Sequence, residues 1–108
     1  MAREVTQEAF AAAWADGALV VDAREADEHA AGHVPGARLM TLRTVPTRCG
    51  ELPPGRPVFV ICASGNRSRT AADWMNSRGF DAYSVTGGTS AWTRAGHPVA
   101  TGSHEHAT

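Results

Sequence analysis

Short apolar runs recur along the chain and predict the strands of a sheet. Residues 18–21 and 58–61 are continuous apolar runs, a pattern typical of strands that are covered on both faces. Two further strands are predicted at residues 37–40 and 82–85, where apolar segments follow turn-forming residues. Glycine, proline or polar residues bound each run, so all of these strands are expected to be short.

Helical patterns alternate with the predicted strands. In residues 6–15, Thr6 is suited to cap a helix in which Phe10 and Trp14 share one face. The remaining predicted helices are residues 25–31, a short helix capped by Thr44, residues 68–78 and residues 89–95. Strands that alternate with helices predict an α/β fold, in which a mostly parallel sheet carries helices on both faces.

The length and the distribution of apolar residues predict one domain, which we expect to span residues 1–100. Residues 101–108 are polar and predict a disordered tail. The apolar runs, such as residues 58–63, are far shorter than the ~20 residues of a membrane helix. The first residues also lack the apolar stretch of a signal peptide. We therefore expect a cytoplasmic protein with reduced cysteines and no membrane partner.

Charge and composition exclude several classes of function. The chain has 10 basic and 11 acidic residues and a formal net charge of −1, so nothing favours nucleic acid as a partner. All the basic residues are arginine, and the absence of lysine excludes Schiff-base chemistry and a P-loop lysine. Two cysteines, Cys49 and Cys62, are too few for a disulfide framework or a four-cysteine zinc site, although one bridge between them is allowed.

Cys62 directly follows the apolar run 58–61, where open α/β sheets place their ligand sites. The segment between Cys62 and the next helix is small and polar and contains Gly65, so its backbone N–H groups can turn inward towards an anion. A helix N-terminus and a neighbouring arginine lower the pKa of a thiol below ~8.5. Cys62 is therefore a candidate nucleophile; the alternative is a buried cysteine that only packs. The candidate substrate-binding residues are Ala63, Ser64, Gly65, Asn66, Arg67 and Ser68.

Residues 60–68, Val-Ile-Cys-Ala-Ser-Gly-Asn-Arg-Ser, resemble the active-site loop of the rhodaneses, a family of sulfurtransferases. Further segments that resemble signatures of this family, in the same order, are residues 21–25, 32–37, 79–83 and 87–92. Together they span about residues 4–99. The resemblance implies a rhodanese-like fold with a five-stranded, mostly parallel sheet flanked by helices on both faces. It also implies that Cys62 accepts a sulfane sulfur and becomes a persulfide.

For a domain of this kind we predict sulfur transfer in two half-reactions. The Cys62 thiolate takes sulfur from thiosulfate or a persulfide donor, while loop N–H groups and Arg67 hold the departing anion. Cyanide, a thiol or a protein then accepts the sulfur, and no metal or organic cofactor is expected. The chain is expected to be a monomer or a weak homodimer. The alternative is a sulfur-relay or binding module that serves one protein partner with little turnover of free thiosulfate.

A phosphatase is the other chemistry that this kind of site suggests. Dual-specificity phosphatases with a related fold have a loop that is one residue longer between cysteine and arginine. Here four residues separate Cys62 from Arg67, which matches the sulfurtransferase loop. We expect the shorter loop to be too tight for a phosphate group.

Several polar residues have alternative roles. Arg67 either holds the charge of the substrate or bridges to a carboxylate and stiffens the loop. Ser64 either donates a hydrogen bond to the persulfide or points to water. Arg69, in the first turn of the predicted helix, is expected to be solvated. Cys49 acts as a resolving thiol only if it approaches Cys62, and we expect it to be incidental.

Asp22, Arg24 and His33 are expected to support the site rather than react. Asp22 and Arg24 follow the predicted strand 18–21 and favour an ion pair or a hydrogen-bond anchor. His33 resembles a turn residue of the family. His29 and His33 have the i, i+4 spacing of metal ligands, but Gly32 is expected to end the helix between them, so no metal site is predicted.

Overall fold

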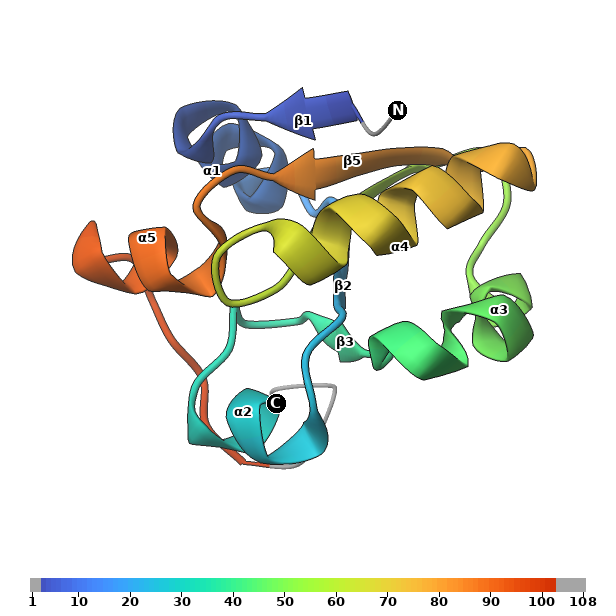
Figure 1. The fold of residues 1–108 in the computed structure, drawn as a ribbon. Helices are drawn as coiled ribbons and strands as arrows, with labels where there is room; N and C mark the ends of the chain where they lie inside the picture. The colour runs from blue at the N-terminus through green and yellow to red at the C-terminus, as the bar shows by residue number, and fades with distance from the viewer. Residues whose placement is uncertain (1–2, 103–108) are drawn as a thin grey trace.

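The computed structural model describes residues 3–102, and its framework is a five-stranded parallel sheet (Figure 1). The strands are β1 (Arg3–Val5), β2 (Leu19–Asp22), β3 (Arg38–Leu39), β4 (Pro57–Ile61) and β5 (Asp81–Val85). Their order across the sheet is β1-β5-β4-β2-β3, and every neighbouring pair is parallel. The carboxyl ends of all these strands therefore lie at one edge, where open α/β sheets bind ligands.

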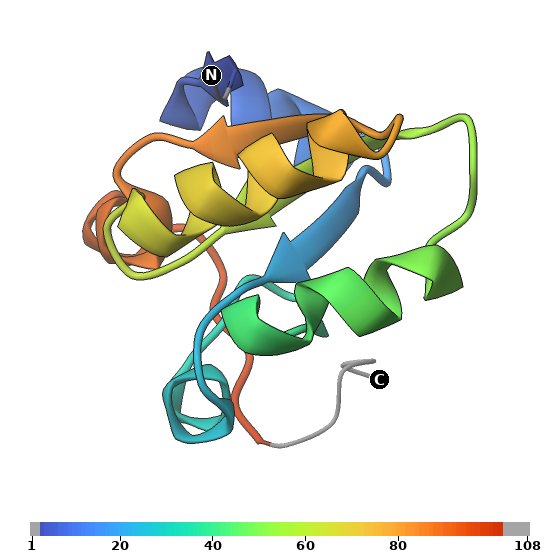
Figure 2. The ribbon, with the colours of Figure 1, turned by 45° about the vertical axis from the view of Figure 1, so that its right-hand side comes forward.

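Helices cover both faces of the sheet (Figure 1 and Figure 2). They are α1 (Gln7–Ala15), α2 (Ala26–Ala31), α3 (Val45–Arg48), α4 (Asn66–Ser77) and α5 (Gly88–Arg94). The 3₁₀-helix η1 (Leu42–Thr44) precedes α3, and η2 (Cys49–Glu51) follows it. Helices α3 and α4 pack on one face, and α1 and α5 pack on the other. The predicted α/β class is confirmed. Within residues 3–102, no helix is both long enough and apolar enough to span a membrane.

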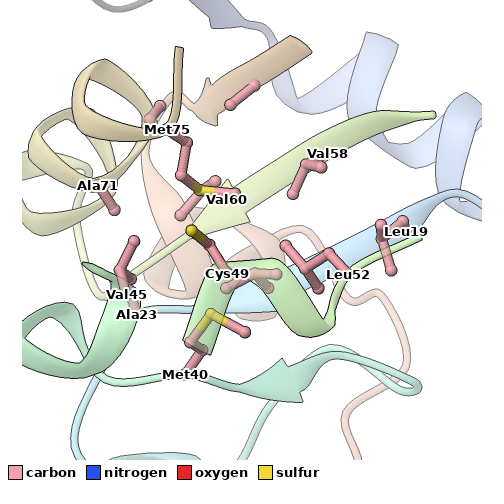
Figure 3. Packing of buried hydrophobic residues seen from close by; sticks show 13 residues of the cluster. Leu19, Ala23, Met40, Val45, Cys49, Leu52, Val58, Val60, Ala71 and Met75 are labelled. Carbon is pink, nitrogen blue, oxygen red and sulfur yellow. The ribbon is translucent and has the colours of Figure 1, made fainter. Parts of the chain in front are cut away.

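Strand β4 joins the two halves of the core because its side chains alternate between the faces of the sheet. Val58 and Val60 belong to the apolar cluster under α3 and α4, together with Met75 (Figure 3). Ile61 belongs to the cluster under α1 and α5, and Phe59 packs against it. Both elements that flank Cys62, strand β4 and helix α4, are thus anchored by buried apolar contacts.

Helix boundaries agree with the sequence pattern where a local cap decides them. Thr6 caps α1 as predicted, and its Oγ1 accepts a hydrogen bond from the Ala9 N–H at 3.1 Å. Thr44 is the N-cap residue of α3 as predicted, but its side chain makes no capping hydrogen bond; its Oγ1 donates to the Thr41 carbonyl at 2.8 Å instead. Helix α4 begins at Asn66, before the predicted residue 68, because Gly65 is its N-cap.

Strand β1 is an element that the apolar pattern did not predict. It has only three residues, and Arg3 and Glu4 are exposed, so it lacks an apolar run. It pairs with β5 at the edge of the sheet. The resemblance to rhodaneses implied five strands, and β1 is the strand that completes this number.

The segment after α5 returns across the molecule to α2 (Figure 1). His33 and Ala100 form an isolated antiparallel bridge. The Gly102 N–H donates to the Ala30 carbonyl at 2.8 Å. The start of the predicted tail, residues 101–108, is therefore hydrogen-bonded to the domain, and residues 103–108 lie outside the described residues.

Candidate active site

The Cys62 thiol lies at the end of β4, where only 1% of the residue is exposed. Its Sγ accepts hydrogen bonds from the Gly65 N–H at 3.1 Å and the Ser68 N–H at 3.3 Å, and it lies 3.4 Å from the Ser68 Oγ. Burial is the largest single influence on the pKa of Cys62 and raises it. The Ser68 hydroxyl and the backbone N–H groups of Ser68, Gly65 and Ser64 together outweigh burial, so this pKa lies below its ordinary value.

The backbone at Gly65 makes these donors converge. Its φ of +123° is a conformation that L side chains rarely adopt, and it turns the chain from the loop directly into α4. Asn66, Arg67 and Ser68 consequently form the first turn of the helix. The unpaired N–H groups and the positive end of the helix dipole therefore face the sulfur, which favours a thiolate.

Helix α5 holds the start of the loop through close backbone contacts. The Thr89 N–H donates to the Cys62 carbonyl at 2.8 Å, and the Ser90 N–H donates to the Ala63 carbonyl at 3.1 Å. A Cβ on Gly88 would lie 2.4 Å from the Cys62 carbonyl oxygen, so only glycine fits there. The loop is thus fixed from the side of α5 as well as by α4 (Figure 1).

A pair of buried hydroxyls lies behind the thiol. The Ser68 Oγ is 2.7 Å from the Ser84 Oγ of β5 and 3.0 Å from the Gly65 carbonyl oxygen. Both serines are fully buried. Sequence reasoning did not select Ser84, although alternation along β5 places it on the same face as the buried Ala82. Ser84 connects the hydroxyl beside the sulfur to the sheet.

Arg67 forms a bidentate ion pair with Glu28 of α2. The distances from its Nη1 and Nη2 to the two carboxylate oxygens are 2.7 and 2.9 Å. The pair lowers the pKa of Glu28 to about 2 and raises the pKa of Arg67. Of the two roles considered for Arg67, this geometry corresponds to the carboxylate bridge. Glu28 was not selected from the sequence, because only the fold brings α2 beside the loop.

Buried polar groups fix the turn between β2 and α2. The Asp22 carboxylate accepts hydrogen bonds from Arg24, with Nη2 at 2.8 Å, and from the His29 Nδ1 at 2.9 Å. Arg24 also donates to the Gly32 carbonyl at 2.7 Å, and the His33 Nδ1 donates to the His29 carbonyl at 2.7 Å. Burial lowers the pKa of His33, so this ring stays neutral. These residues support the loop through α2, and the hydrogen bonds of the sulfur are to Gly65 and Ser68 instead.

The geometry contains no metal centre within the described chain. Helix α2 ends at Ala31, and the rings of His29 and His33 stack with centroids 3.7 Å apart. Over residues 3–102, no group of three potential ligands among histidine, cysteine and carboxylates converges on one point.

Ser64 and Asn66 are the exposed residues of the loop. The Asn66 Oδ1 accepts a hydrogen bond from the exposed Arg69 guanidinium, which lies beside Gly65. Arg69 is therefore exposed at the outside of the loop and also bonds to Asn66. Both cysteines are free, so the bridge that the composition allowed does not form, and Cys49 lies in the apolar cluster under α3 and α4.

Comparisons with known proteins find relatives of this chain in sequence and in fold. The family described as "Rhodanese-like domain" matches residues 6–95. The thiosulfate sulfurtransferase GlpE of Pseudomonas putida (strain GB-1) is 41% identical over 87 residues, which cover 80% of this chain and 78% of that protein. The structure of a rhodanese-related protein from Thermoplasma volcanium has a TM-score of 0.85 at 26% identity and covers 91% of this chain and 97% of its own. A thiosulfate sulfurtransferase from Pseudomonas aeruginosa has the same TM-score and identity and covers 94% of this chain and 20% of its own.

Proposed function

Because the chain belongs to the rhodanese-like domain family, we propose that it is a sulfurtransferase that carries a sulfane sulfur on Cys62. The proposal rests on the surroundings of the thiol. A buried sulfur that accepts two backbone N–H bonds and has a lowered pKa is suited to carry the negative charge of a thiolate. The thiosulfate sulfurtransferase among the relatives supports thiosulfate as a donor.

In the first half-reaction, the Cys62 thiolate attacks the outer sulfur of thiosulfate. A new S–S bond forms to Cys62, the S–S bond of thiosulfate breaks, and its electron pair leaves with sulfite. A persulfide anion remains on Cys62. We expect the N–H groups of Gly65 and Ser68 to share its negative charge, because they already converge on the sulfur.

In the second half-reaction, cyanide, a thiol or a protein nucleophile attacks the outer sulfur of the persulfide. The S–S bond to Cys62 breaks, and its electron pair returns to the Cys62 thiolate. The same backbone N–H groups stabilise the negative charge that returns to the Cys62 sulfur. Because the two substrates react in turn, the expected kinetics are ping-pong. Neither step calls for a cofactor.

The role of Arg67 in this scheme is to hold the loop. Its guanidinium is committed to Glu28, so the charge of a donor anion is expected to meet backbone N–H groups first. We further propose that residues 1–100 act as one domain in the cytoplasm, where thiols stay reduced.

Incubation with thiosulfate, followed by mass spectrometry and then by addition of cyanide, tests the proposal. We expect Cys62 to gain one sulfur atom and to release it as thiocyanate. The Cys62→Ser variant should gain none, and Cys49→Ser should behave as the wild type. Failure of the wild type to gain sulfur from both thiosulfate and a persulfide donor would overturn the proposal. Sulfur that loads but does not pass to cyanide would favour the relay module that serves a protein partner.

A further inference from the structure

A groove of about 500 Å³ runs along α5 beside the candidate active site. Helix α2 forms its opposite wall, and Ala63, the residue after Cys62, lies at one side of it. The proposed chemistry uses none of the groove residues on α5. Since an acceptor must approach the loop from outside, a groove that reaches Ala63, the residue after Cys62, is a candidate path for it.

The charges along the groove do not cancel. Arg24 is paired with Asp22, and Glu28 is paired with Arg67. Arg94, near the end of α5, is the remaining charged residue of the groove, and it has no ion-pair or hydrogen-bond partner within residues 3–102. The groove therefore has one cation available for an anionic group of a ligand.

The groove also offers a polar group close to the loop and an apolar wall. Thr89 is only 6% exposed, and its hydroxyl has no hydrogen-bond partner among the described residues. Such an unsatisfied buried hydroxyl is costly unless a ligand or water completes it. Val99, which is 40% exposed, lines the same groove and provides apolar surface.

The spacing along α5 limits the shape of a ligand. Thr89 contacts the backbone of Cys62, and Arg94 follows five residues later on the same helix. At a rise of about 1.5 Å per residue, Thr89 and Arg94 are about 7–8 Å apart along the helix axis. An anion held by Arg94 must therefore lie several bonds away from an atom that reacts at Cys62.

We propose that this groove binds the sulfur acceptor and fits a small thiol whose carboxylate lies several bonds from its sulfur, as in a cysteine-containing peptide. The proposal rests on the sulfurtransferase activity proposed above. The thiolate of the acceptor attacks the outer sulfur of the Cys62 persulfide. The acceptor gains an S–S bond, the bond to Cys62 breaks, and the electron pair returns to the Cys62 thiolate, so no external oxidant or reductant is needed.

A matched pair of acceptors tests the proposal: N-acetylcysteinylglycine and its C-terminal amide, which differ in one carboxylate. The protein is first loaded with thiosulfate, and loss of sulfur from Cys62 is then followed with each acceptor. We expect the wild type to react about three- to fivefold faster with the acid at subsaturating concentration, as one partly exposed ion pair allows. Arg94→Gln should lower the rate with the acid to that with the amide.

Two further variants separate a specific effect from a general one. Val99→Glu places a negative charge in the groove at an exposed position. It should slow the reaction of the acid acceptor more than that of the amide acceptor. Arg78→Gln changes an arginine beside a different cavity and should keep the preference for the acid. Equal rates of acid and amide in the wild type, or equal losses for both in Arg94→Gln, would overturn the groove proposal. Loading is measured separately, so a protein that takes up no sulfur contradicts the sulfurtransferase proposal instead.

Discussion

Cys62 and Cys49 are both free and both buried, with 1% and 6% of their surface exposed, but their surroundings differ. Cys49 begins η2 and belongs to an apolar cluster with Met40, Val45 and other side chains under α3 and α4 (Figure 3). Cys62 begins a loop whose backbone N–H groups converge on its sulfur. Burial alone therefore does not distinguish the cysteine that we propose to react from the one that packs.

The difference lies in directed hydrogen-bond donors. The donors to Cys62 come from the loop backbone, the Ser68 hydroxyl lies 3.4 Å from its sulfur, and the nearby arginine is held by Glu28. The reactivity that we propose for Cys62 is consequently a property of the loop conformation more than of a neighbouring charge. Substitutions that affect the loop should lower the activity, and comparable substitutions near Cys49 should affect only the stability.

Replacing each cysteine by serine should give the largest contrast. Cys62→Ser removes the nucleophile, and we expect sulfur transfer from thiosulfate to cyanide to fall by at least ~10³-fold. Cys49→Ser should keep the activity within about twofold but lower the unfolding free energy by about 1–3 kcal/mol, because its hydroxyl is buried among apolar groups. Thiocyanate formation and urea unfolding measure the two effects. A comparable loss of activity in Cys49→Ser would show that Cys49 takes part in the reaction.

Replacing a glycine beside each cysteine should give the next largest contrast. Gly65→Val forces a β-branched side chain into a φ of +123° and moves an N–H away from the sulfur. We expect a loss of about 10²-fold in kcat, as for the removal of an oxyanion donor. At Gly50, beside Cys49, φ is not positive and an added Cβ would meet no atom within 4 Å.

Gly50→Val is therefore the matched control and should keep kcat near that of the wild type. Urea unfolding of both variants shows whether a loss of activity follows from loss of the fold. If Gly65→Val retains full activity, the convergence of N–H groups on the sulfur is not required.

Removing the hydroxyl of Ser84 should have a smaller effect. Ser84→Ala leaves the Ser68 hydroxyl without its partner on β5, so Ser68 is less well placed to donate to a thiolate. The protonated thiol is then favoured, and the pKa of Cys62 rises. We expect alkylation of Cys62 at pH 7 to slow by about fivefold, the value of one hydrogen bond, and its pH profile to move upward.

Ser84→Thr keeps the hydroxyl, so its pH profile of Cys62 alkylation should match that of the wild type. Thr41→Ala removes another largely buried hydroxyl, which bonds to Thr44 across η1, and should leave the alkylation rate of Cys62 unchanged. An unchanged pH profile in Ser84→Ala would limit Ser84 to a packing role.

The local parts of the candidate site could be predicted from the sequence. Strand β4, the position of Cys62 at its end and the helix after the loop follow from an apolar run, a small polar segment and a helical pattern. Each of these signals lies within about a dozen neighbouring residues. The start of α4 was misplaced because it depends on the positive φ of Gly65, which composition alone does not specify.

The long-range contacts could not be predicted. Glu28 and Arg67 are distant in sequence and meet because α2 folds over the loop. Ser84 reaches Ser68 because β4 and β5 are neighbours in the sheet. Strand β1 lacks an apolar run, since an edge strand of three residues buries little surface. Pairing of this kind is a property of the topology, which the pattern along one segment does not contain.

The ion pair between Glu28 and Arg67 should give the smallest effect and should make the region of Cys62 sensitive to acid. The folded-state pKa of Glu28 is about 2, below its ordinary value of 4.5. Its contribution to stability is therefore present above pH 4.5 and is lost as the pH falls towards 2. Because both side chains are about one-third exposed, at 33% and 34%, we expect this contribution to be at most about 1 kcal/mol.

Glu28→Gln should accordingly be slightly less stable than the wild type in urea at pH 7, and the two proteins should converge near pH 2. The same variant releases Arg67, in the first turn of α4, from its ion pair with α2. The rate of Cys62 alkylation at pH 7 should therefore also change. Glu51→Gln breaks the exposed ion pair with Arg48 beside Cys49 and should leave that rate unaltered. If both variants alter the alkylation of Cys62 equally, acidic residues act on the thiol only through the overall charge, and the bridge from α2 has no special role in holding the loop.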